Sequence, residues 1–287
     1  MNTVSLEKPA TNSKAPAFKL APVTPAVGAM ISDIDLSEHQ TPETYQALRQ
    51  ALVDHGVIFL RNQFLSPEQF EHLGEQFGQI HRPNTELIPA LPGTRATAEL
   101  KKKPGQVRNV GGRWHTDQMH SASPSWACLL LARKTPPIGG DTLWASMSKV
   151  YESLSPGLQL ALSQLKGVHT DAELQRSQAT GRLPAQPAVH PAVITHPLSE
   201  KKIVYICSLM TREFDGWTPE ESKPLIDYLY NHAQRPDFTC RFKWEPGSMA
   251  IWDNFETWHF ACNDYEGGDE RVMHRIVVRG PEIGALS

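Results

Sequence analysis

Near the amino terminus, apolar side chains recur with the period of a helix. Tyr45, Leu48 and Leu52 fall on one helical face, Thr41 is suited to cap the start of the helix, and Gly56 is suited to end it. The polar residues between them fall on the opposite face. This pattern predicts an amphipathic helix between Thr41 and Gly56.

A buried strand and a second helix are predicted next. The run VIFL at 57–60 is short and continuously apolar, as is typical of a strand with both faces covered. Ser66 and Gln69 have the spacing of a capping box, and Phe70 and Leu73 begin an apolar stripe. Helix and strand therefore alternate in the first part of the chain.

From about residue 105 onward, short apolar and aromatic runs are separated by glycine and proline turns. These runs lie at 125–132, 141–147, 201–209, 237–244, 248–254 and 273–280. Their spacing favours an antiparallel sandwich or jelly roll. Two helices should interrupt them, one at 155–167 and one after Thr218 with Glu221 as its capping partner. Pro224 should bend the second helix or delay its start.

Composition fits one large domain at 18–287 behind a short leader. The chain has 287 residues, of which 40% are hydrophobic, enough for a large core. Residues 1–17 are rich in Pro, Ala, Ser, Thr and Lys, and are expected to be disordered. The basic run KKKP at 101–104 is expected to be a solvated loop, with a mobile lid over a site as the functional alternative.

Charge and cysteine content narrow the class of protein. A net charge of −3 gives no basic footprint, so neither nucleic acid nor an anionic membrane is expected as a partner. The four cysteines are irregularly spaced without a CxxC pair, which suits free thiols in a reducing compartment. The run ACLLLA at 127–132 is too short to span a bilayer. A soluble cytoplasmic protein is expected.

The stretch GGRWHTDQMH at 111–120 contains a candidate metal site. In an extended segment, His115 and Asp117 would point to one face and Thr116 to the other. His259, which follows an apolar strand, is the best candidate for a third ligand. Two histidines and one carboxylate form the facial triad of non-haem Fe(II) oxygenases, although zinc hydrolases use similar ligands. A surface histidine beside a turn aspartate remains the simpler alternative.

The basic segment near the carboxyl terminus supports the interpretation of a metal site. Arg271, Met273 and Arg275 share one face if the segment is extended. Inward guanidinium groups need anions, because an unpaired buried charge costs several kcal/mol. The pattern predicts carboxylate groups nearby.

Several separated motifs together resemble the TauD/TfdA family of Fe(II)- and 2-oxoglutarate-dependent dioxygenases. They are WHTD, PPIGGDTLWASM at 136–147, THP at 195–197, AIWDN at 250–254 and HFACNDYEGGDERVMHR at 259–275. The resemblance covers about residues 18–282. It implies a mainly β fold with flanking helices, a double-stranded β-helix of the jelly-roll, cupin-like kind. It also implies homo-oligomers, since dimers or tetramers are common in the family.

The resemblance also implies an activity and roles for particular residues. A small anionic organic substrate would be hydroxylated or oxidatively cleaved, with Fe(II) as cofactor, 2-oxoglutarate and O2 as co-substrates, and succinate and CO2 released. His115, Asp117 and His259 match the iron ligands of the family. Thr142 and Arg271 match the residues that bind the 2-oxoglutarate carboxylate.

Substrate recognition is expected to involve Arg275 and a set of variable positions. Arg275 matches the arginine that holds the anionic end of the substrate in sulfonate-using members. The candidate specificity residues, any of which could instead simply pack, are His81, Asn84, Gln118, Met119 and His120. Some of these positions differ from the taurine enzymes, so the substrate need not be taurine.

Two other kinds of function stay open at this point. A metal-dependent hydrolase could use the same triad with zinc, but it has no need for Thr142 or for the paired arginines. A non-catalytic small-molecule-binding protein on the same fold would require the loss of a ligand, and none is visibly lost. Asp253 and Asn254 are expected to orient the loop that delivers His259.

Overall fold

The computed structural model describes residue 6 and residues 17–81, 89–102, 111–173, 183–265 and 269–286. The leader predicted at 1–17 therefore lies almost entirely outside the described residues. None of the helices in these ranges combines the length and apolarity needed to cross a bilayer.

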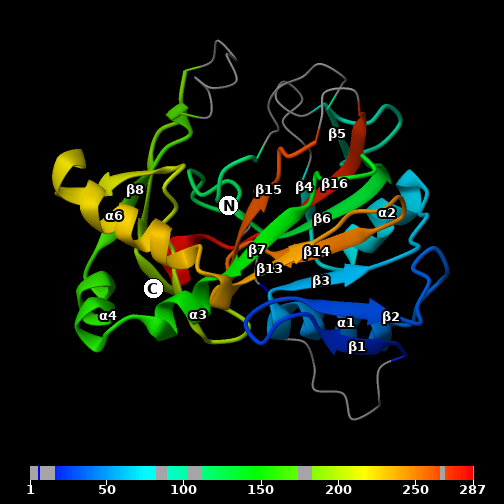
Figure 1. Ribbon diagram of the computed structural model, residues 1–287, viewed down its shortest axis with the longest axis horizontal. Coiled ribbons are helices and arrows are strands. Elements are labelled where there is room, and N and C mark those ends of the chain that lie inside the picture. Colours follow the sequence, from blue (N-terminus) through cyan, green and yellow to red (C-terminus); the bar gives the residue numbers. More distant parts are fainter. Residues whose placement is uncertain are drawn as a thin grey trace.

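A large mixed sheet forms one layer of the fold (Figure 1). Its strands, in spatial order, are β1 (Lys19–Pro22), β2 (Ala29–Ser32), β3 (Val57–Leu60), β14 (Met249–Asp253), β6 (Ser125–Lys134), β16 (Arg271–Arg279) and β4 (Ile80–His81), and β5 (Ala98–Lys102) also pairs with β16. β2 and β3 are parallel and the other pairs are antiparallel. The predicted runs at 57–60, 125–132, 248–254 and 273–280 are confirmed as strands of this sheet.

A smaller antiparallel sheet covers one face of the large one. It consists of β13 (Thr239–Phe242), β7 (Thr142–Ser146) and β15 (Thr257–Ala261). Aromatic rings fill the space between the layers: Phe59 stacks on Phe242 at 4.3 Å between ring centroids and meets Trp144 edge-on at 5.2 Å. Two sheets joined by such a core form the predicted jelly roll.

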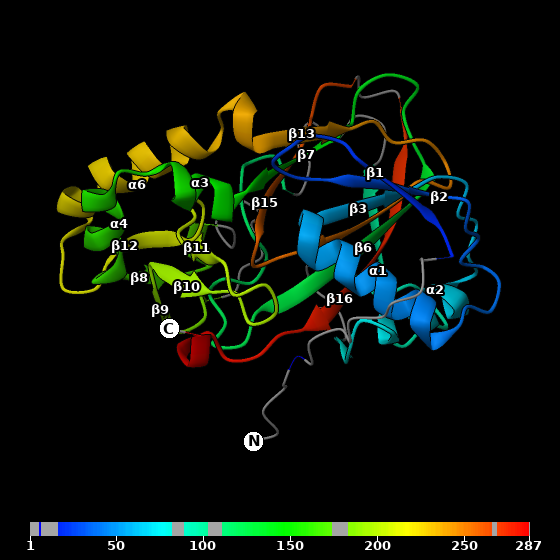
Figure 2. The ribbon, with the colours of Figure 1, turned by 90° about the horizontal axis from the view of Figure 1, so that it is seen from below.

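Two amphipathic helices cover the opposite face of the large sheet, as Figure 2 shows. They are α1 (Pro42–His55) and α2 (Pro67–Glu75), and both match their predictions. Thr41 caps α1, and Ser66 and Gln69 complete the capping box of α2. Leu48 and Leu52 are fully buried against the sheet, so the apolar stripe faces the core as its period requires.

The remaining elements gather beside the β layers, at the left of Figures 1 and 2. They are α3 (Met147–Ser153), α4 (Pro156–Ser163), α6 (Pro219–Ala233), β8 (Lys166–His169), β9 (Ala188–Pro191), β10 (Val193–Thr195), β11 (Lys202–Val204), β12 (Thr211–Phe214) and the 3-10 turns Pro236–Phe238 and Ile283–Leu286. The capping box of Thr218 and Glu221 is confirmed. Helix α6 begins directly after its cap and runs through Pro224, so the proline does not delay its start.

Some local predictions need correction. Helix α3 was not predicted, because the apolar run at 141–147 looks like one strand; the strand ends at Ser146, whose side chain caps α3. The run at 201–209 forms a strand only over β11. The solvated loop expected at 101–104 is wrong for Lys101 and Lys102, which belong to β5, while residues 103–104 lie outside the described residues.

Glu71 of α2 anchors the segment that enters β5. Its carboxylate, only 5% exposed, accepts hydrogen bonds from the backbone amides of Ala96 at 2.5 Å and Thr97 at 2.9 Å, and Arg95 lies 3.3 Å away. Burial alone would raise the pKa of the Glu71 carboxyl, but the amide donors and the Arg95 charge outweigh it, so this pKa lies below its ordinary value. These Glu71 contacts hold the start of β5 in place, and β5 in turn pairs with β16.

We expect Glu71→Gln to lower the free energy of unfolding by about 1–3 kcal/mol, because buried amide donors lose a charged acceptor. A depressed folded-state pKa means that this stability is present above the ordinary pKa of 4.5 and is lost as the pH falls below it. Urea unfolding should therefore show a difference near pH 7 that shrinks at about pH 3.5.

Glu75→Gln is the matched control for this experiment. Its side chain pairs with the same Arg95 but is 38% exposed. We expect a change below about 0.5 kcal/mol for this variant. Equal losses for the two variants would show that Glu71 has no anchoring role.

Candidate functional site

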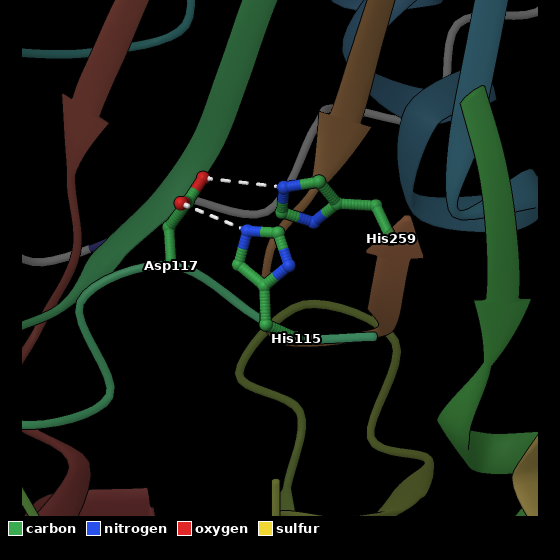
Figure 3. A group of neighbouring side chains, drawn as sticks. All are labelled: His115, Asp117 and His259. Carbon is green, nitrogen blue, oxygen red and sulfur yellow. Dashed lines mark ion pairs between the residues drawn. The ribbon is translucent and has the colours of Figure 1, made fainter. Parts of the chain in front are cut away.

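Two neighbouring side chains, His115 and Asp117, meet the sequence-distant His259 at one end of the cavity between the sheets (Figure 3). His115 Nε2 lies 3.8 Å from Asp117 Oδ1, and His259 Nε2 lies 3.7 Å from Asp117 Oδ2. One donor atom from each residue lies within 4.8 Å of the other two. His115 and His259 are 7% and 8% exposed, so the group faces the interior.

Two reciprocal backbone hydrogen bonds hold His115 and His259 next to each other. The His115 amide donates to the His259 carbonyl at 3.1 Å, and the His259 amide donates to the His115 carbonyl at 2.7 Å. Nδ1 of His115 lies 2.7 Å from the carbonyl oxygen of Arg113. Because that oxygen can only accept, Nδ1 carries the proton and Nε2 keeps its lone pair for a ligand.

Asp117 reaches the group from a turn, which corrects the expectation that residues 114–117 form a strand. Only His115 makes a β-bridge, and Asp117 lies in the turn that follows. Asn254 fixes this turn: its amide nitrogen donates to the Asp117 carbonyl at 2.9 Å, and its amide oxygen accepts from the Asp117 amide at 3.0 Å. The Thr116 hydroxyl donates to the Asn254 carbonyl.

The Asp117 carboxylate has further partners behind the histidines. Arg275 donates to Oδ2 at 2.5 Å, and the Cys128 thiol donates to the same oxygen at 3.4 Å. Burial raises the pKa of the Cys128 thiol to about 12, so it remains a protonated donor and not a nucleophile. These contacts orient the carboxylate toward the two Nε2 atoms.

The protonation states of the group are those that a metal requires. Burial would raise the pKa of the Asp117 carboxyl, but Arg275 and the two imidazoles lower it well below its usual range. Burial lowers the pKa of His115 below its usual value, and it lowers the pKa of His259 well below its usual value. A carboxylate and two neutral imidazoles result near neutral pH.

The other end of the same cavity holds Thr142 and Arg271. The Thr142 hydroxyl accepts a hydrogen bond from Trp244 Nε1 at 2.9 Å, which leaves its own hydrogen to donate. Burial lowers the pKa of the Arg271 guanidinium. Its Nε and Nη2 atoms are buried and have no hydrogen-bond partner among the described residues.

The structure thus brings six of the candidate residues into one cavity, whose empty volume is about 510 Å³ with its open mouth included. Its lining consists of Leu100, Gly111, His115, Asp117, Leu130, Thr142, Trp252, His259, Ala261, Arg271 and Arg275. The two arginines come from one face of β16, as their spacing predicted.

The four candidate specificity residues that the structure describes, His81, Gln118, Met119 and His120, are not among the residues that line this cavity. Gln118 adopts a left-handed backbone conformation, φ 57°, and its side chain accepts from the Ser125 amide at 3.2 Å. Met119 is fully buried in the core. His120 is half-buried, His81 is half-buried on β4, and Asn84 lies outside the described residues.

Cys128 and Trp244 are site residues that the sequence analysis missed. The alternation of β6 places Cys128 on the same face as Leu130, which was a usable signal, but its contact with Asp117 depends on tertiary structure. Gly111, at the start of the stretch 111–120, also lines the cavity. A Cβ at Gly111 would lie 3.1 Å from His115 Cε1, so the backbone passes close behind that ring.

The residues fit both Fe(II) and a dicarboxylate. Two neutral imidazoles and one carboxylate on a single side leave the other coordination positions open, as in the non-haem iron facial triad. The N–H groups of Arg271 that lack partners and the free hydroxyl hydrogen of Thr142 can donate hydrogen bonds to the carboxylate of a bound small molecule. This pairing of sites distinguishes the cavity from a simple metal centre.

Comparisons with known proteins agree with this geometry. The alkylsulfatase of Acinetobacter baylyi is 32% identical over 92% of this chain and 85% of its own length. The alpha-ketoglutarate-dependent sulfate ester dioxygenase of Pseudomonas putida is 30% identical, over 94% and 92%. The crystal structure of a taurine dioxygenase from Burkholderia xenovorans covers 92% of both chains with a TM-score of 0.79 and 32% identity.

The family model for the taurine catabolism dioxygenase TauD, TfdA family matches residues 19–277. It spans both sheets, the His115, Asp117 and His259 group, and both arginines of β16. The chain therefore belongs to the TauD/TfdA family and is an Fe(II)- and 2-oxoglutarate-dependent dioxygenase.

Proposed function

We propose that His115, Asp117 and His259 hold Fe(II), and that Thr142 and Arg271 bind the distal carboxylate of 2-oxoglutarate. The observation that carries this assignment is the buried Arg271 guanidinium, whose Nε and Nη2 lack partners in the cavity that contains the triad. A buried cation without an anion is costly, so a carboxylate ligand explains why it is there. When bound, the metal and 2-oxoglutarate supply the oxygen activation that forms succinate and CO2 and oxidises a substrate C–H bond.

The chain's own residues bind, orient and exclude water. His115 and His259 present lone pairs at Nε2, and Asp117 presents a carboxylate whose direction Asn254 and Arg275 set. Leu130 and other apolar lining residues limit access of water. Arg271 and Thr142 fix one end of 2-oxoglutarate, so its 2-oxo acid end meets the triad.

We propose that the substrate is a small organic anion held by Arg275. Its Nη2 is engaged with Asp117, but its Nε is buried without a described partner, so the Nε–H is left to donate to an anion. Relatives named for sulfate esters and sulfonates support an oxygen-rich anion of this kind. Sulfate esters and sulfonates are the first candidates, followed by aryloxyalkanoates and amino-acid derivatives.

Substrate selection is assigned to His81, Asn84, Gln118, Met119 and His120, as the sequence analysis proposed. His120 supports this best, because its Nδ1 is buried without a described partner. The buried Met119 would act only through packing. We further propose a single domain over residues 18–287 that acts as a homodimer or homotetramer in the cytoplasm, without a nucleic-acid or membrane partner.

Addition of Fe(II) and 2-oxoglutarate to the purified protein without oxygen should produce a weak visible charge-transfer band. With O2 and a substrate, succinate should then form. A panel that pairs each alkyl sulfate or sulfonate with its uncharged parent alcohol would test the anion requirement. Turnover of the substrate with zinc, in the absence of O2 and 2-oxoglutarate, would instead indicate a hydrolase. If fully iron-loaded protein gives neither the charge-transfer band nor succinate, the dioxygenase assignment is refuted.

Arg271→Ala should weaken 2-oxoglutarate binding about 100-fold, because a buried charge-assisted contact is lost. The substrate dissociation constant should change little, since Arg275 remains. Calorimetric titration of the Mn(II)-loaded protein measures both constants. Arg279→Ala, on the same strand but exposed, is the control and should have no effect. Equal losses for co-substrate and substrate would contradict the division between the two arginines.

Asn254→Ala should weaken Mn(II) binding about 10- to 100-fold, because the turn that aims Asp117 loses its clamp. Asn254 is fully buried, so the titration, followed by electron paramagnetic resonance of free Mn(II), belongs well below the melting temperature of the variant. Asn231→Ala, at an exposed site on α6, is the control. An unchanged metal affinity in a folded Asn254→Ala protein would rule out the orienting role.

A further inference from the structure

Lys102, the last residue of β5, is a buried cation to which the site described above gives no role. It is 8% exposed, whereas its neighbour Lys101 has a side chain that is 40% exposed and pairs with Glu270 at 2.5 Å. Lysine is rarely buried to this degree without a partner. Its burial therefore requires an explanation that the adjacent lysine does not.

The register of the strands places Lys102 on the face of the sheet that borders the cavity, next to Arg271. In the antiparallel pairing of β5 with β16, Lys102 lies directly opposite Arg271. Side chains that are directly opposite share one face of the sheet, with Cβ atoms about 4.5–5.5 Å apart. Leu100, two residues earlier in β5, lines the cavity, and alternation places Lys102 on the same face. Lys102 and Arg271 are thus neighbouring cations on one face of the sheet, beside the part of the cavity that Arg271 lines.

The groups around this pair leave it rich in positive charge. Lys102 Nζ donates to Asn263 Oδ1 at 2.7 Å and lies 3.9 Å from the centroid of the Tyr265 ring, both uncharged partners. No carboxylate within the described ranges forms an ion pair with Lys102. Asp141 lies close enough to raise the pKa of Arg271, but its Oδ2 is paired with Arg241 at 2.6 Å.

Such an arrangement favours an anion. Like charges directly opposite each other destabilise a strand pair, and an anion beside both removes that cost. The Arg271 N–H groups without partners mark the side on which it would bind. The Asn263 contact uses one N–H of the ammonium and leaves the others to donate.

We propose that Lys102 is a second cation for the distal carboxylate of 2-oxoglutarate, beside Arg271, and that it makes the pocket select a dicarboxylate over a 2-oxo monocarboxylate. This inference rests on the function proposed above. Arg271 offers a planar fork to one edge of the carboxylate, and Lys102 adds a compact point charge.

The test is calorimetric titration of the full chain loaded with Mn(II). The ligands are 2-oxoglutarate and 2-oxopentanoate, which has the same carbon chain without the distal carboxylate. Lys102→Met should weaken 2-oxoglutarate binding about 10-fold or more, a free-energy change of about 1.4 kcal/mol or more, and leave 2-oxopentanoate binding unchanged. Lys101→Met is the matched control and should bind both ligands like the wild type.

Three further results bear on the proposal. Lys102→Arg, which keeps the charge, should recover most of the affinity. The melting temperature of the Lys102→Met protein without ligand should equal or exceed that of the wild type, because a repulsion is removed, whereas a purely structural lysine would give a lower one. Equal weakening of both ligands, or no weakening, overturns the inference. Failure of the wild type itself to bind 2-oxoglutarate would instead overturn the proposed function.

Discussion

The site depends on one buried ion pair, between Asp117 and Arg275. A carboxylate removed from water needs a compensating charge, and Arg275 on β16 supplies it, with its Nη2 2.5 Å from Asp117 Oδ2. The pairing raises the pKa of the Arg275 guanidinium, although burial alone would lower it, and keeps Asp117 ionised beside two neutral imidazoles. Strand β16 must therefore lie next to the turn that carries Asp117, and β6, which pairs with β16, also provides the Cys128 thiol. The jelly roll holds these elements in that relation, while Asn254 at the end of β14 fixes the turn.

Local signals accounted for much of the fold because they act within a few residues. Capping residues and apolar stripes predicted α1, α2 and α6 closely, since a cap or a stripe is complete within one segment. Where one apolar run contained two elements, the prediction failed. Residues 141–147 contain enough apolar side chains to suggest one strand, yet the Ser146 side chain caps the start of α3 within this segment. The solvated loop expected at 101–104 failed for Lys101 and Lys102 because lysines seldom indicate a strand, and the pairing with β16 and the contacts of Lys102 with Asn263 and Tyr265 depend on tertiary structure.

For the site, the sequence could indicate which residues share a face but not which faces meet. The period of an extended strand placed Arg271 and Arg275 together, and both line the cavity. The same reasoning correctly predicted that His115 and Asp117 lie together, but strand alternation is not the cause. Only His115 makes a β-bridge, and hydrogen bonds with Asn254 position Asp117 in the turn that follows. The link from His115 to His259 is a pair of reciprocal backbone hydrogen bonds across 144 positions of sequence, which no local pattern reveals. Cys128 and Trp244 likewise act through contacts with distant residues.

The spacing of charges along β16 relates the two anions that the protein is proposed to bind. Arg271 and Arg275 are four positions apart, which corresponds to about 13 Å of extended strand. Arg275 is already engaged by Asp117, so a substrate anion must share it, whereas Arg271 has no such competitor among the described residues. Anion binding should therefore be stronger at the Arg271 end, and Lys102 increases this difference. A dicarboxylate would fill the strongly cationic end first, and its other end would reach the triad. The weaker anion position beside Asp117 then remains for the substrate, so the asymmetry of partners along one strand is enough to keep co-substrate and substrate apart.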